Sequence, residues 1–191
     1  MKFAGYALVS TLALLGACSG GKQPDATAPA PTFHEIMKEK VDKNADALWD
    51  LTNTAISDDA GLDAGKLTDA QWTEMATRAE AVQQAALEIA AMPDPIVVAK
   101  PGVKIADEGI QGGHTAAMVQ KEVDRNPQGL RDMSSTMAAH MGDMAKALRA
   151  HDAAKAGPLI DQLDGVCESC HLEYWYPTQK ALIEKYGIKT K

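Results

Sequence analysis

Apolar residues recur at three- and four-residue steps over four stretches of the chain. That spacing puts them on one face of an α-helix, as in helices that share a core. The stretches are residues 33–56, 69–92, 127–151 and 152–177. Because the sequence has no convincing strand pattern and no repeat, it predicts an all-α fold, and more closely an antiparallel four-helix bundle.

Polar and proline residues mark several of the expected helix ends. Thr68 is the expected N-cap of the second stretch. Pro93 and Pro95 end that stretch, because proline cannot continue the helical hydrogen-bond ladder. Beyond Pro177 a short tail helix can form at residues 180–186, where Gly187 would end it.

The predicted core stripe of the first stretch includes Met37 and is interrupted at Asn44. In the third stretch Met137, Met141 and Met144 also follow helical spacing. We interpret these three as core filling rather than as a metal or cofactor site, because flexible methionine side chains fill irregular gaps. The stripe of the first stretch consists of Phe33, Met37, Val41, Leu48, Leu51 and Ala55.

Residues 95–126 are the least regular part of the sequence and contain several prolines and glycines. A connection of this length in a compact domain is usually functional or mobile. Two interpretations stay open. The link covers one face of a bound cofactor, or it is a plain crossover that runs along the bundle.

Length and charge narrow the class of protein. With 191 residues the chain suits one domain. The formal net charge of −7 is spread along the sequence, which argues against nucleic acid as a partner, since that would need a clustered basic face. An acidic surface can meet a basic redox partner protein, although most acidic surfaces are simply solvated.

The N-terminus has the pattern of a bacterial secretion signal, with a lysine, a short apolar run and small residues. Residues 15–18 resemble a lipobox, in which Cys18 would carry lipid after cleavage; an ordinary cleaved signal is the alternative. Ser19 resembles signals for sorting to the outer rather than the inner membrane. We therefore expect a signal peptide at 1–17, a tether at 18–32, a helical domain at 33–177, a tail at 178–191 and a lipid-anchored periplasmic location.

Near the C-terminus, Cys167 and Cys170 are followed at once by His171. Two cysteines three apart with an adjacent histidine form the attachment pattern of a c-type haem. On a helix the two sulfurs lie one turn apart on one face, while the histidine is rotated by about 100° from Cys170. The sequence therefore predicts one covalent haem c, with His171 as an iron ligand.

Other readings of the two cysteines are a dithiol redox pair, a zinc half-site or buried structural cysteines. A dithiol pair would be expected at a helix N-terminus after a strand, whereas Cys167 and Cys170 lie late in a helical pattern. A tetrahedral zinc site needs four ligands, and no second paired motif supplies the others. Haem attachment is therefore our preferred interpretation.

The chain resembles the cytochrome c-prime family, also called class II cytochromes c, over residues 33–177. The resemblance rests on the position of Cys167, Cys170 and His171 in the last helical stretch. It implies a four-helix bundle with haem near the end of the last helix, and dimers occur in the family. Tyr174 matches the aromatic residue that follows the family's histidine, but Trp175 replaces a basic residue.

Antiparallel packing would bring the start of the first helix beside the end of the fourth. Met37 is then the best candidate for the sixth iron ligand, opposite His171. The resemblance to the cytochrome c-prime family implies two possibilities, because the low-spin branch of that family uses a methionine at this position, whereas the high-spin branch leaves the position open under an apolar residue. Met37 is also a core position by spacing. His34 lies one turn too early, where we expect it to be solvated or to face the tether, so ligation of the iron by two histidines is a remote alternative.

Two functions follow from these alternatives. With Met37 bound, the iron would be closed to substrates and the protein would carry single electrons. With Met37 unbound, an apolar pocket would bind small gases such as nitric oxide or carbon monoxide. Enzyme activity, for instance as a peroxidase, is not expected, since the first helix offers only His34 and Glu35 as polar groups.

Overall fold

A computed structural model describes residues 29–56, 61–110 and 113–186 of the chain. Helices account for 73% of the described residues, and these residues contain no strand. Within them Ile56 and Leu62 form an isolated antiparallel bridge. The all-α prediction is confirmed. Cys18 and the predicted signal peptide lie outside the described residues.

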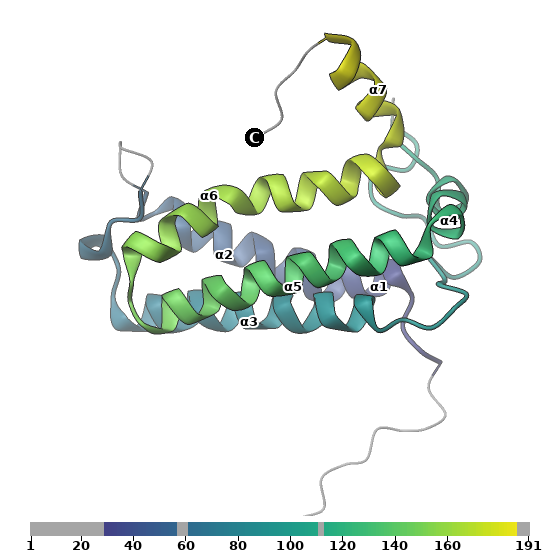
Figure 1. The fold of residues 1–191 in the computed structure, drawn as a ribbon. Helices are drawn as coiled ribbons and strands as arrows, with labels where there is room; N and C mark the ends of the chain where they lie inside the picture. Colours follow the sequence, from purple (N-terminus) through teal and green to yellow (C-terminus); the bar gives the residue numbers. More distant parts are fainter. Residues whose placement is uncertain (1–28, 57–60, 111–112, 187–191) are drawn as a thin grey trace, which may run out of the picture. The chain divides into compact units, whose positions relative to one another are not determined.

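The helices of the unit Pro31–Lys191 follow one another along the chain, with the longest connection at residues 91–115 (Figure 1). The first helical run has three consecutive parts, α1, the π-helical segment η1 and α2. The last long run joins α6 directly to a second π-helical segment, η3. The bounds are α1 Phe33–Ile36, η1 Met37–Asp42, α2 Lys43–Asn53, the short 3₁₀ turn η2 Ala64–Lys66, α3 Asp69–Ala90, α4 Ala116–Arg125, α5 Pro127–Arg149, α6 Ala153–Cys170, η3 His171–Trp175 and α7 Pro177–Tyr186.

Side-chain caps set several helix starts. The Thr68 hydroxyl oxygen accepts a hydrogen bond from the Gln71 backbone amide, and the Gln71 side-chain oxygen accepts one from the Thr68 backbone amide, so the predicted N-cap is confirmed. Thr32 and Glu35 form the same capping box at the start of α1. Asp152 caps α6 through the Lys155 backbone. These caps satisfy amide groups that have no partner inside a helix.

The prediction that residues 95–126 are irregular is wrong for the last third of this range, where α4 forms. Thr115 caps this helix, and Val119 and Val123 are buried one turn apart. The tail helix also begins earlier than expected, at Pro177 rather than Lys180. Proline is tolerated in the first turn of a helix, because the amide it lacks would have no partner there.

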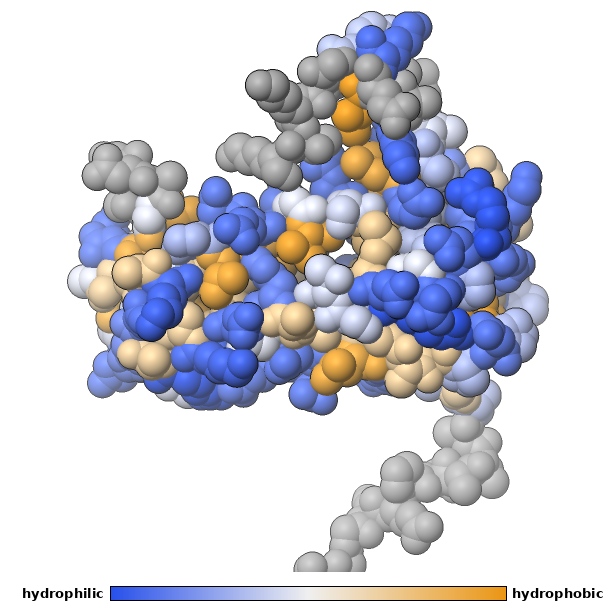
Figure 2. Space-filling view, in the orientation of Figure 1, coloured by the Kyte–Doolittle hydropathy of each residue, from blue (hydrophilic) through white to orange (hydrophobic). Residues whose placement is uncertain are grey.

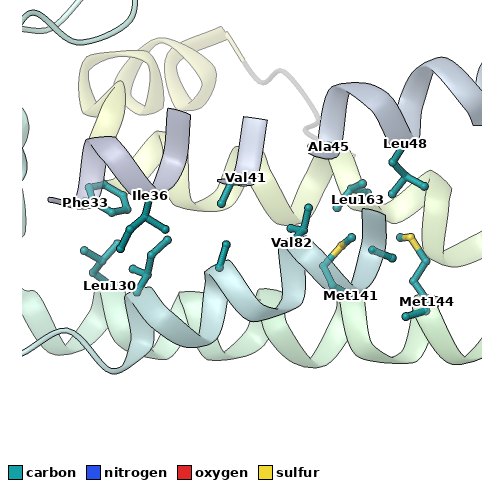
Figure 3. Close-up of a cluster of buried hydrophobic side chains, with 14 of the residues drawn as sticks. Phe33, Ile36, Val41, Ala45, Leu48, Val82, Leu130, Met141, Met144 and Leu163 are labelled. Atoms are coloured by element: carbon teal, nitrogen blue, oxygen red, sulfur yellow. The ribbon is translucent and has the colours of Figure 1, made fainter. Parts of the chain in front are cut away.

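A shared apolar core lies between the long helices. α3 runs along α5 and also contacts α2, while α5 contacts α6 (Figure 1). Figure 3 shows buried side chains of the first run pointing toward those of α3, α5 and α6. The residues labelled there are Phe33, Ile36, Val41, Ala45, Leu48, Val82, Leu130, Met141, Met144 and Leu163.

The register of the first run differs from the predicted stripe. Ile36 is 1% exposed and Val41 is 4% exposed, whereas Met37 is only half-buried. Successive core positions Ile36 and Val41 are thus five residues apart, which is the step of a π-turn. After Val41 the core positions return to α-helical steps at Ala45 and Leu48.

This register predicts which side chain of the first run stabilises the fold. Ile36→Ala should lower the free energy of unfolding by about 2–5 kcal/mol, because it removes fully buried apolar atoms and leaves a cavity. Asp46→Ala, at an exposed position of α2, should change it by less than about 0.5 kcal/mol. Denaturant unfolding followed by circular dichroism measures both. Equal effects of the two substitutions would contradict the assigned register.

Candidate functional site

The cysteine and histidine motif lies where α6 passes into η3. Cys167 and Cys170 occupy the last turn of α6, and His171 begins the π-helical segment. The His171 amide donates hydrogen bonds to the carbonyl oxygens of Cys167 and Glu168, so helical backbone continues through the motif. The two thiols therefore lie one turn apart on a helix, as the spacing predicts. Both cysteines are free.

Burial sets the protonation state of both thiols. It raises the pKa of Cys167 to about 11, with a further contribution from Asp164 and Asp42. It raises the pKa of Cys170 to about 12, with contributions from Cys167 and Glu173. A redox-active dithiol depends on a thiolate with a lowered pKa. Raised values argue against that alternative.

His171 is also shaped by partial burial. Removal from water lowers the pKa of its imidazole, and Asp42, Glu168 and Asp164 partly oppose this effect. A neutral imidazole keeps a nitrogen lone pair available for a metal. The environment of His171 thus favours the form that can act as a ligand.

Two aromatic residues after His171 connect this end of the chain to other helices. Tyr174 is buried, and its hydroxyl donates to the Asn126 carbonyl oxygen over 2.9 Å. The Trp175 ring packs edge-on against Phe33, with ring centroids 6.2 Å apart. This last contact joins the end of η3 to the beginning of α1. Trp175 therefore acts as a packing residue.

Two cavities meet at this junction and share Met37, His171 and Trp175 in their linings. The smaller, of about 40 Å³, is bordered by both cysteines and by apolar residues of α1, η1, α3, α5 and α6. Figure 2 shows a hollow edged by hydrophobic residues on the face where α5 and α6 lie. The other lining residues of this cavity are Phe33, Val41, Ile89, Met133, Ser134, Met137, Val166, Cys167 and Cys170.

The larger cavity has a volume of about 520 Å³, which is in the range of cofactor pockets. It is open to solvent and carries most of the polar side chains of the junction. Besides the three shared residues it is lined by His34, Lys38, Asp42, Lys104, Ile105, Ala106 and Tyr176. Met37 and His171 therefore face the same space, from the first and the last helical run.

The π-segment η1 explains the placement of Met37. A strict α-helical register would continue the core stripe through Met37, as the sequence predicts. The five-residue step puts Ile36 into the core instead and leaves Met37 at the cavity wall. The alternative that Met37 is merely core filling is thereby weakened, although it still contacts the core cluster.

His34 differs from its expected position. It is 8% exposed rather than solvated, and its ring lines the larger cavity. Its backbone amide donates to the Val98 carbonyl oxygen over 2.8 Å, and that of Phe33 donates to Val97 over 2.9 Å. The long link thus caps the start of α1 and holds His34 away from solvent.

The link reaches into the cavity itself through Lys104, Ile105 and Ala106. Close behind them, the Asp107 carboxylate accepts a hydrogen bond from the Tyr176 hydroxyl, whose ring packs edge-on against His171 at 6.1 Å. Asp107 has a φ of 61°, an uncommon backbone conformation outside glycine. The link therefore forms part of the cavity wall and contacts the residue beside His171.

The remaining histidines and methionines separate into other roles. His140 bonds to the Leu159 carbonyl oxygen, and His151 stacks on Trp72. Met141 and Met144 are fully buried, so their interpretation as core filling is confirmed. Met137 instead lines the smaller cavity together with Met133.

The described residues contain no group of three or more histidine, cysteine, aspartate or glutamate side chains that could hold a metal ion. Cys167, Cys170 and His171 accordingly do not converge on one point. They are candidates to hold a cofactor rather than a bare metal ion. Among the described helices, none is long and apolar enough to cross a membrane.

Several site residues were missed by the sequence analysis. Lys38 and Asp42 lie on η1, and Lys104 lies in the link, 62 positions after Asp42 along the chain. The five-residue step from Ile36 to Val41 was the available signal for η1. No local pattern indicates that Lys104 faces the same cavity.

The raised pKa values of the two thiols allow their burial to be tested without any cofactor. In the haem-free protein lacking residues 1–18, alkylation of Cys167 and Cys170 by iodoacetamide at pH 7 should be at least about 100-fold slower than that of an unhindered cysteine. The rate should rise about tenfold per pH unit beyond pH 9, because only the thiolate reacts. Urea-unfolded protein is the control. A plateau in rate below pH 9 would contradict the described burial.

Comparison with known proteins adds no relative to this picture. A scan against family models, a search of curated proteins and a search of solved structures each found no match to the chain.

Proposed function

We propose that the protein is a monohaem c-type cytochrome that carries single electrons, and that its long helices form an antiparallel four-helix bundle with haem c attached near the end of the last one. The observation that carries the proposal is the pair of adjoining cavities at one junction. Cys167 and Cys170 border one, and His171 and Met37 border both. The proposal is consistent with the resemblance to the cytochrome c-prime family.

The donor set fits a covalently attached haem. Each protonated thiol can add its S–H across a vinyl group and form a thioether, and burial keeps both thiols protonated. Neutral His171 can bind iron through a ring nitrogen. Haem iron supplies a one-electron couple between the ferrous and ferric states when it is bound. The protein side chains set its surroundings.

The apolar residues next to the cysteines serve this function by excluding water. Phe33, Val41 and Ile89 are each buried and line the smaller cavity. A low-polarity environment disfavours extra charge on the metal and so influences the potential. A thioether from Met37 as sixth ligand would favour the ferrous state relative to a second histidine.

Three methionines border the smaller cavity, so the sixth ligand can be tested against matched controls. Met37→Ala in the haem-loaded protein should abolish the weak long-wavelength band of methionine-ligated ferric haem and give a high-spin spectrum. Met133→Leu and Met137→Leu should leave that band in place, because these residues lie on α5 and do not line the larger cavity. Visible absorption of the oxidised and reduced forms measures all three.

If the band persists in Met37→Ala and disappears in one of the controls, the ligand assignment to Met37 is wrong.

The larger cavity favours a second candidate function. Its volume of about 520 Å³ leaves room for a small molecule beside the iron if Met37 does not coordinate. The protein would then be a five-coordinate haem protein that binds nitric oxide or carbon monoxide. A high-spin spectrum of the unaltered protein that shifts on addition of carbon monoxide would favour it.

We also propose export to the bacterial periplasm and lipid attachment at Cys18, with the outer membrane preferred. Support comes from the N-terminal sequence alone, since those residues lie outside the described part. Covalent haem attachment outside the cytoplasm fits the same location. The redox partner is a protein that meets the helical domain from the periplasmic side.

A further inference from the structure

We infer that Lys38 and Lys104 form a carboxylate-binding subsite that receives the two propionate groups of the haem. The inference rests on the proposed haem attachment. It gives the long link a direct role in cofactor binding, because Lys104 belongs to the link and Lys38 to η1.

The first argument is the order of residues along the two cavities. The cysteines line only the smaller cavity, Met37 and His171 line both, and the two lysines line only the larger one. Haem has the same order of chemical groups, with vinyls on one side, iron at the centre and propionates on the other side. A haem held by Cys167 and Cys170, with His171 as an iron ligand, would therefore have its carboxylates on the side of the larger cavity.

The second argument is that neither the Lys38 nor the Lys104 ammonium group makes a salt bridge or a hydrogen bond within the described residues, although Lys38 acts on the Glu39 carboxylate through space. Nearby lysines differ: Lys40 pairs with Glu88, and Lys100 pairs with Glu35 at 2.5 Å. Two unpaired ammonium groups at the wall of one cavity make a site for an anion with more than one carboxylate.

The third argument concerns the opposing charge of Asp42, which lines the same cavity. Burial raises the pKa of Asp42 and Asp46 raises it further, while His171 and His34 lower it. Asp42 also acts on the Cys167 thiol. Asp42 lines the larger cavity together with the two lysines, so the wall carries two ammonium groups against one carboxylate.

The backbone on both sides of Lys104 is anchored. The Val103 amide bonds to the Lys100 carbonyl oxygen, and the Ile105 amide bonds to the Glu108 carboxylate. Ile105 is 5% exposed, so its side chain fixes this part of the link to the core. Lys104 is therefore held at the cavity by its neighbours and does not depend on a haem contact for its position.

The test uses the haem-loaded protein with Lys38→Gln, Lys104→Gln and the double substitution. Lys121→Gln is the matched control, because Lys121 also lacks a salt bridge within the described residues but lines a different cavity, beside His114. Two quantities are measured: the midpoint potential, and the resonance Raman bending frequency of the propionates, which reports hydrogen bonds to their oxygens.

Both lysine substitutions should lower the midpoint potential, because each removes a positive charge that favours the reduced iron. Both should also shift the propionate bending frequency. Lys104→Arg, which keeps a positive charge, should leave the frequency close to that of the unaltered protein. Lys121→Gln should change neither quantity. A fall in potential with an unchanged bending frequency would overturn propionate binding, as would variants that match the Lys121 control.

Loss of covalent haem is a separate outcome. If the unaltered protein takes up no haem, the proposed function itself fails and the subsite fails with it. If the unaltered protein carries haem and the lysine variants behave as the control, only the subsite is overturned.

Discussion

Burial of Ile36 and Val41, five positions apart on the first helical run, fixes the register on which the site depends. An α-helix cannot place residues at that spacing on one narrow stripe, since each residue rotates the chain by about 100°. The π-turn absorbs the extra residue. As a result Met37, Lys38 and Asp42 leave the core and face the cavity shared with His171. Packing of the core thereby positions polar and coordinating side chains that contribute little to the core themselves.

The second π-segment, η3, does the same at the other end of the chain. It follows directly on Cys170 and lets Tyr174 and Trp175 both pack inward while His171 faces the cavity. Phe33 against Trp175 then joins the two segments. Two local departures from α-helical geometry therefore meet at one junction, which is a frequent property of functional sites in helical proteins.

Much of this arrangement follows from sequence pattern, because helices and the spacing of Cys167, Cys170 and His171 are local properties. The α3 helix is an example, with its N-cap at Thr68 and a periodic stripe of buried residues. The α4 helix escaped prediction because its buried stripe is only Val119 and Val123, next to glycine-rich chain. Lys104 could not be placed, since its proximity to Lys38 arises from the path of the link over α1, which no local pattern encodes.

The proposed function requires that Cys167 and Cys170 attach one haem. This attachment is tested by the intact mass of the protein in which a cleavable signal peptide replaces residues 1–18, exported to the periplasm of a host that has a haem-attachment system. Covalent attachment predicts a gain of one haem in mass that survives denaturation and acid extraction, and that is lost when both cysteines are replaced by serine. A protein with two free thiols and no added mass under those conditions would contradict haem attachment.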